Sequence, residues 1–92
     1  MPQDSDAWTV FAQTFTNGDL VPVRITRVLA YGAEVEVVAL PGVQGLIHIS
    51  ELSDRHVADP REVVSELVVV NARIAKIDAP RRRLGLSLRG PR

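Results

Sequence analysis

The chain of 92 residues contains no cysteine, which excludes disulfide bonds, a thiolate nucleophile and the usual cysteine-rich zinc sites. It has no apolar run long enough to span a membrane. The first residues, MPQDSDAW, lack the basic and apolar regions of a signal peptide. These absences predict a cytoplasmic protein without a membrane partner, and the length predicts one small domain.

An excess of charge of either sign is also absent, because eleven basic and eleven acidic residues cancel. Residues 79–92, however, carry five arginines and no acidic residue, namely Arg81, Arg82, Arg83, Arg89 and Arg92. The other 78 residues therefore hold six basic and eleven acidic side chains, so the chain is dipolar. A dipolar chain can present an attractive edge to an anion, although a solvated basic terminus is the simpler interpretation of composition alone.

Aromatic residues are few, and three of the four fall in the first segment. Trp8, Phe11 and Phe15 are three and four residues apart, a spacing that places them on one face of a helix. One of residues 4–6 could cap its start, and Asn17-Gly18 is a suitable stop. We expect this helical extension, residues 1–17, to pack onto a domain at residues 18–90.

Alternation of apolar and polar residues predicts five strands in the rest of the chain, at residues 20–29, 33–40, 45–50, 68–78 and 83–89. In the third strand, Leu46, His48 and Ser50 are expected to share one face. Asp59, followed by Pro60 and Glu62, matches a helix N-cap, which predicts a helix from Pro60 to about Leu67. Five strands with a helix between the third and fourth predict an all-β fold, the closed OB-type barrel.

Several short motifs together resemble the S1 motif, the RNA-binding domain repeated in ribosomal protein S1. The match covers roughly residues 18–89, and GLIHISEL with LSLR downstream is highly specific. The likeness is to a repeat of a bacterial ribosomal protein S1, of the actinobacterial type in particular. The matching positions are Gly18, Tyr31-Gly32-Ala33, Gly45 to Leu52, Ile77-Asp78 and Arg83 to Leu88.

The resemblance implies a monomeric module that binds single-stranded RNA with low sequence specificity, in translation or RNA metabolism. Bases of such a ligand stack on aromatic rings while basic groups reach the backbone. Tyr31 matches the first aromatic of the family's binding face, and His48, Asp78 and Arg83 match three further site positions. Two other basic residues are expected to reach the RNA backbone, Arg24 and Lys76.

The chain departs from the family pattern at three positions. Glu34 stands where a phenylalanine usually follows Gly-Ala, so a stacking ring is replaced by a carboxylate that should repel phosphate. Val23 and Leu67 stand at positions that are often glycine. The alternative function is therefore a degenerate domain that docks onto a ribosome or another protein. The face of Trp8, Phe11 and Phe15 is its natural contact if that face is not folded onto the barrel.

An enzyme is not expected, and neither is a cofactor. Ser50 and Ser53 lie near the two histidines in sequence, but no nucleophile elbow or oxyanion loop accompanies them. Asp54 and His56 are too few and too badly spaced for a metal site.

Overall fold

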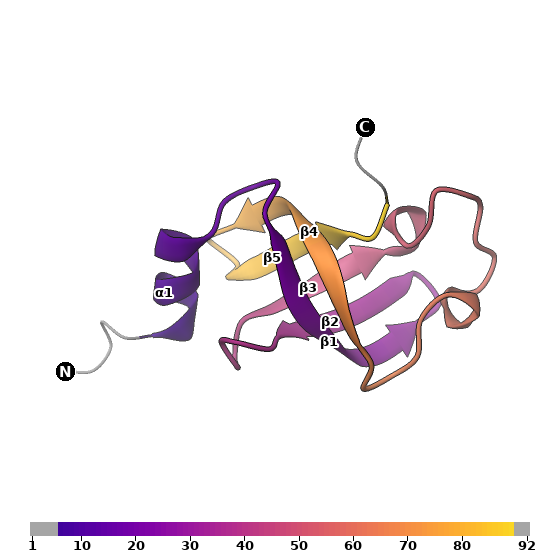
Figure 1. Ribbon diagram of the computed structural model, residues 1–92, viewed down its shortest axis with the longest axis horizontal. Helices are drawn as coiled ribbons and strands as arrows, with labels where there is room; N and C mark the ends of the chain where they lie inside the picture. The colour runs from indigo at the N-terminus through magenta and orange to yellow at the C-terminus, as the bar shows by residue number, and fades with distance from the viewer. Residues whose placement is uncertain (1–5, 90–92) are drawn as a thin grey trace.

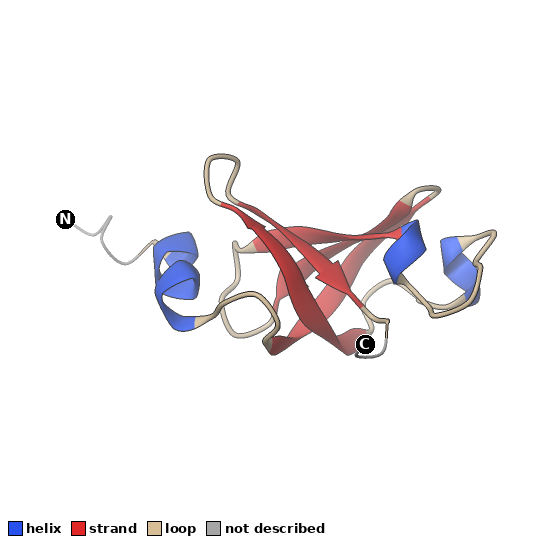
Figure 2. Cartoon of the chain, turned by 90° about the horizontal axis from the view of Figure 1, so that it is seen from above, coloured by secondary structure: helices blue, strands red, loops and turns tan. Residues whose placement is uncertain are grey.

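The computed structural model describes residues 6–89, which form a closed five-stranded barrel with one α-helix at its end (Figures 1 and 2). The helix, α1, covers Ala7–Thr14. The strands are β1 (Leu20–Leu29), β2 (Gly32–Val37), β3 (Gln44–His48), β4 (Val69–Asp78) and β5 (Arg83–Ser87). Their order around the barrel is β1-β2-β3-β5-β4. The expected all-β OB-type barrel is confirmed.

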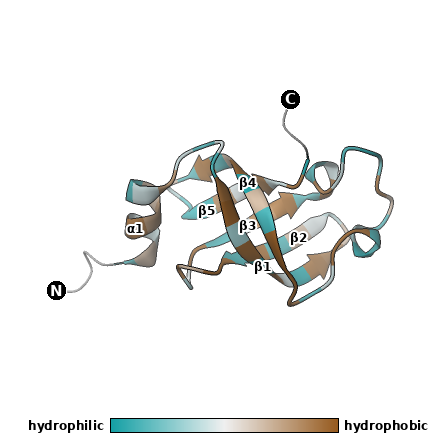
Figure 3. Cartoon of the chain, in the orientation of Figure 1, coloured by the Kyte–Doolittle hydropathy of each residue, from teal (hydrophilic) through white to brown (hydrophobic). Residues whose placement is uncertain are grey.

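The barrel closes through one parallel pairing, between β3 and β5, while the other four pairings are antiparallel. Hydrophobic and hydrophilic residues alternate along the strands (Figure 3). Strand alternation directs one set of side chains inward, and this set forms the core. Every strand contributes to it, with Val23, Val35, Ile47, Ile74 and Leu86 among the buried residues.

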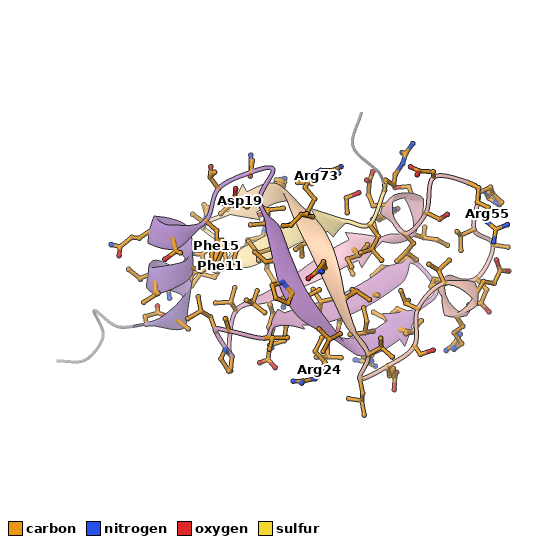
Figure 4. The ribbon with its side chains drawn as sticks, in the orientation of Figure 1. Phe11, Phe15, Asp19, Arg24, Arg55 and Arg73 are labelled. Carbon is orange, nitrogen blue, oxygen red and sulfur yellow. The ribbon has the colours of Figure 1, made fainter. Side chains whose placement is uncertain are left out.

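Helix α1 closes one end of the barrel with its aromatic face, as Figure 4 shows for Phe11 and Phe15. Asp6 begins the helix, because its carboxylate accepts a hydrogen bond from the backbone N–H of Trp8 at 3.0 Å. The other candidate caps, Asp4 and Ser5, lie outside the described residues. Trp8 is 7% exposed and Phe11 is fully buried. The aromatic face therefore packs into the barrel's own core and is not available as a docking surface.

The second and third strands end earlier than expected. β2 stops at Val37 instead of Leu40, because the chain turns back and the backbone N–H of Val37 donates to the Val43 carbonyl. β3 stops at His48, and residues 49–51 form a short 3-10 helix, η2 (Ile49–Glu51). The prediction that Ser50 continues the face of Leu46 and His48 is therefore wrong, since Ser50 has left the strand.

The helix predicted from Pro60 to about Leu67 is much shorter in the structure, so the predicted length is wrong. Only a 3-10 helix of three residues forms, η3 (Pro60–Glu62), with Asp59 as its N-cap as predicted. The β-branched pair that follows, Val63 and Val64, favours a helix poorly. The chain then has to reach β4, and it turns through Leu67 in a left-handed conformation.

Leu67 has a φ of 70°, a value that costs a side chain with a Cβ roughly 1–2 kcal/mol. Its side chain is 73% exposed and buries little that could offset this cost. We expect Leu67→Gly to stabilise the protein by about 1 kcal/mol in urea unfolding. Leu20→Gly is the control: Leu20 is similarly exposed, at 69%, but lies in β1, where glycine should destabilise by about 0.5–1 kcal/mol. A loss of stability in both variants would contradict the strain at Leu67.

Candidate nucleic-acid interface

An open groove of about 770 Å³ lies on the outward face of β3, β5 and β4. The strand register places three residues side by side in the floor of the groove. Leu46 of β3 is paired with Gly85 of β5, and Gly85 is paired with Lys76 of β4. Gly85 has no side chain, so the surface is hollowed between its neighbours. Four of the six predicted site residues line this groove, namely His48, Lys76, Asp78 and Arg83.

His48 is held in place by the start of η2. Its Nδ1 accepts the backbone N–H of Ser50 at 3.3 Å and lies 3.1 Å from the Ser50 hydroxyl. In the neutral ring, this acceptor role at Nδ1 leaves the proton on Nε2. The exposed imidazole therefore offers an N–H donor and a ring face to a ligand in the groove.

Asp78 is paired with Arg81, a residue that the sequence motifs did not indicate. The carboxylate accepts from the Arg81 guanidinium at 3.2 Å and from the Arg81 backbone N–H at 3.3 Å. The hydrogen bond from the Arg81 side chain holds the pKa of Asp78 below its ordinary value, so this carboxyl stays ionised. Asp78 thus fixes the hairpin between β4 and β5 and places a further guanidinium at the groove.

The groove carries a small positive charge. Its lining contains three cations, Lys76, Arg81 and Arg83, and two carboxylates, Asp78 and Glu51, so it sums to +1 with His48 neutral. The Glu51 carboxylate accepts a hydrogen bond from the hydroxyl of the buried Ser87 at 2.7 Å. The lining therefore provides cationic donors at its rim and an apolar floor.

The remaining two predicted residues lie outside the groove lining. Tyr31 is in the turn before β2, 52% exposed, and its carbonyl accepts the Ile49 N–H at 2.8 Å. The next residue, Gly32, is paired with His48, so Tyr31 is close to the His48 end of the groove. Arg24 is farther away: it lies on β1 opposite Glu36 and projects from the barrel (Figure 4). Its predicted contact with RNA stays a prediction.

Glu34 is at the border of the groove. Its Cα partner on β3 is Leu46, which lies in the groove floor, and its partner on β1 is Arg27. Side chains of directly opposed residues share a face, so Glu34 stands on the same face as Leu46 and Arg27. Neither Glu34 nor Arg27 lines the groove, and the charges of these two partners offset each other.

Arg81 and Glu51 are the charged groove residues that were not among the predicted site residues. The spacing of Asp78 and Arg81, three residues apart across a turn, is the signal that could have identified the first. Glu51 belongs to the GLIHISEL motif, and its partner Ser87 belongs to LSLR. These two motif residues join η2 to the end of β5 and so support the wall that carries His48.

The OB-type barrel with this one-sided groove belongs to the S1 RNA-binding domain family. The family model, described as S1 RNA binding domain, matches residues 14–89. The family suggested by the sequence motifs is therefore confirmed.

Curated relatives are ribosomal proteins. The chain is 43% identical over 84 residues to small ribosomal subunit protein bS1 of Mycolicibacterium smegmatis, a match that covers 91% of this chain and 17% of that protein. It is 34% identical over 82 residues to the bS1 homolog of Bacillus subtilis, covering 89% of this chain and 21% of that protein. The chain thus spans about a fifth of the length of these relatives.

Two solved structures share the fold. A chain in the crystal structure of an a/eIF2alpha–aDim2p–rRNA complex from Pyrococcus horikoshii superposes with a TM-score of 0.78 and 31% identity, covering 82% of this chain and 45% of that one. The solution structure of GSP13 from Bacillus subtilis gives a TM-score of 0.74 and 32% identity, covering 86% and 62%.

Neither a metal site nor a membrane-spanning helix is found in residues 6–89. Within this range, no group of three or more His, Asp or Glu side chains is arranged to hold a metal ion. No helix there is long and apolar enough to cross a membrane.

Proposed function

We propose that this chain binds single-stranded RNA with low sequence specificity, as a monomeric cytoplasmic module of translation or RNA metabolism. The observation that carries the proposal is the groove, which gathers His48, Lys76, Arg81 and Arg83 over an apolar floor in a member of the S1 family. The cations suit phosphate oxygens, and the His48 ring and Tyr31 suit bases. Stacking and phosphate contacts do not depend on the identity of the base, which supports binding of many sequences.

Fluorescence anisotropy with a labelled oligouridylate tests this function. We expect binding at about 50 mM salt that weakens as salt rises, with a slope of log K against log salt of about −2 if three phosphates are neutralised. Absence of binding by micromolar protein at about 50 mM salt would overturn the proposal.

A protein-docking module with little RNA affinity is the second candidate, and Glu34 is the observation that favours it. Its carboxylate stands next to Leu46 of the groove floor, at the position where the family pattern has a second stacking ring. The aromatic face of α1 cannot serve as the contact of such a module, because it is buried.

Replacing Glu34 tests whether the groove is the RNA site. We expect Glu34→Phe to strengthen oligouridylate binding about tenfold, since a stacked base contributes about 1–3 kcal/mol and a repulsive charge is removed. Glu34→Gln removes the charge alone, and we expect a gain of about two- to threefold. Unchanged affinity in both variants, measured by anisotropy, would mean that the groove is not the RNA site.

A further inference from the structure

A second hollow, of about 670 Å³, lies at the end of the barrel away from α1. We call it the loop hollow; it is open to solvent and is lined by Ile49, Ser50, the loop of residues 53–58, and Arg89. Arg55 marks this end of the molecule in Figure 4. The groove described above does not include any of these residues.

Arg89 enters the loop hollow from a fixed backbone. The backbone N–H of Arg89 donates a hydrogen bond to the Ser87 hydroxyl oxygen at 3.0 Å, and the backbone carbonyl of Arg89 accepts one from the Arg73 guanidinium at 3.0 Å. The Arg89 Nε is buried and has no hydrogen-bond acceptor among residues 6–89. Asp54 lies 3.6 Å from this nitrogen, close enough for ionic attraction but too far for a hydrogen bond.

The charge and chemistry of the loop hollow suit a phosphate group. Arg55 and Arg89 against Asp54 leave a charge of +1, with His56 counted as neutral. Hydroxyls of Ser50 and Ser53 and the imidazole of His56 add neutral hydrogen-bonding groups. Guanidinium forks with neighbouring hydroxyls are a donor set that matches the several oxygens of a phosphodiester.

The loop hollow is separated from the groove by one short wall, formed by His48 and Ser50. His48 lines the groove, Ser50 lines the hollow, and the two are hydrogen-bonded to each other. A strand that leaves the groove past the His48 ring therefore arrives at Ser50 and the hollow.

We propose that the loop hollow is a second phosphate-binding subsite for the same RNA strand, with Arg55 and Arg89 as its cationic contacts. This inference rests on the proposed RNA binding in the groove and extends it beyond the length of strand that the groove holds. A short oligonucleotide would occupy the groove alone, whereas a longer one would reach both sites.

The test compares a tetranucleotide with a dodecanucleotide of uridylate by anisotropy. We expect Arg55→Gln and Arg89→Gln each to weaken dodecanucleotide binding about three- to tenfold and to reduce its salt slope by about 0.7, while tetranucleotide binding stays within about twofold. Arg61→Gln is the matched control, because this exposed arginine lies in neighbouring η3, outside the groove and the loop hollow. Arg55 is exposed, so its variant should fold even if Arg89→Gln does not.

The outcomes distinguish this inference from the function on which it rests. If Arg55→Gln binds the dodecanucleotide with the same affinity as Arg61→Gln, the subsite is overturned while RNA binding in the groove is left intact. Equal weakening of both oligonucleotides would also overturn it, because the arginine would then act on the groove. Absence of wild-type binding to either oligonucleotide would overturn the proposed function, and the subsite with it.

Discussion

Gly32→Ala is expected to destabilise the barrel by about 3–5 kcal/mol, because the added methyl group has no room between β2 and β3. A Cβ at this position would overlap the Ile47 carbonyl oxygen and lie 3.0 Å from the His48 Cα. Both atoms belong to the backbone of β3, so neither can rotate away. The φ of 154° adds strain for any residue with a side chain.

Two other glycines provide matched controls for this effect. Gly18 and Gly42 also have positive φ, 96° and 101°, but a Cβ at either would meet nothing within 4 Å. Gly18→Ala and Gly42→Ala should therefore cost about 1 kcal/mol each, from conformational strain alone. Urea unfolding followed by the fluorescence of Trp8, the only tryptophan, measures all three. Equal stability of Gly32→Ala and Gly42→Ala would contradict the close approach of β2 and β3.

Tyr31→Ala is expected to weaken oligouridylate binding about tenfold, because base stacking on an aromatic ring contributes about 1–3 kcal/mol. The ring is half exposed and belongs to a turn, so its removal should leave the barrel folded. The Tyr31 carbonyl, which holds the Ile49 N–H, is retained in the variant. The loss should therefore appear in affinity and not in the urea midpoint.

Tyr31→Phe is the control, because it keeps the ring and removes the hydroxyl. We expect its affinity to stay within about twofold of the wild type if stacking is the interaction. A comparable loss in both variants would show that the hydroxyl, not the ring, contacts the ligand. Unchanged binding in Tyr31→Ala would remove this residue from the site.

The five strands could be predicted because each alternates apolar and polar residues around a barrel interior. The boundaries that were wrong depend on contacts that alternation does not reveal. Ser50 leaves the third strand because the His48 ring caps the next turn. The short η3 gives way to a turn because the chain must reach β4 through Leu67.

The candidate site was predicted from family motifs. His48 joins the residues of β4 and β5 through the parallel pairing of β3 with β5. His48 and Arg83 are far apart in the sequence, and local sequence does not reveal that their strands are neighbours. Arg81 was not predicted because a run of arginines in a hairpin is usually a solvated surface. Its pairing with Asp78 becomes evident only when the turn is built.

The most direct test of RNA binding in the groove is an NMR titration of the isotopically labelled protein with a uridylate tetranucleotide. We expect the backbone amide signals of His48, Lys76, Arg83 and Gly85 to shift together, with Tyr31 at one end of the affected surface. Shifts confined to the opposite side of the barrel, at Leu20, Val69 and Asn71, would contradict this placement, as would an unchanged spectrum at low salt.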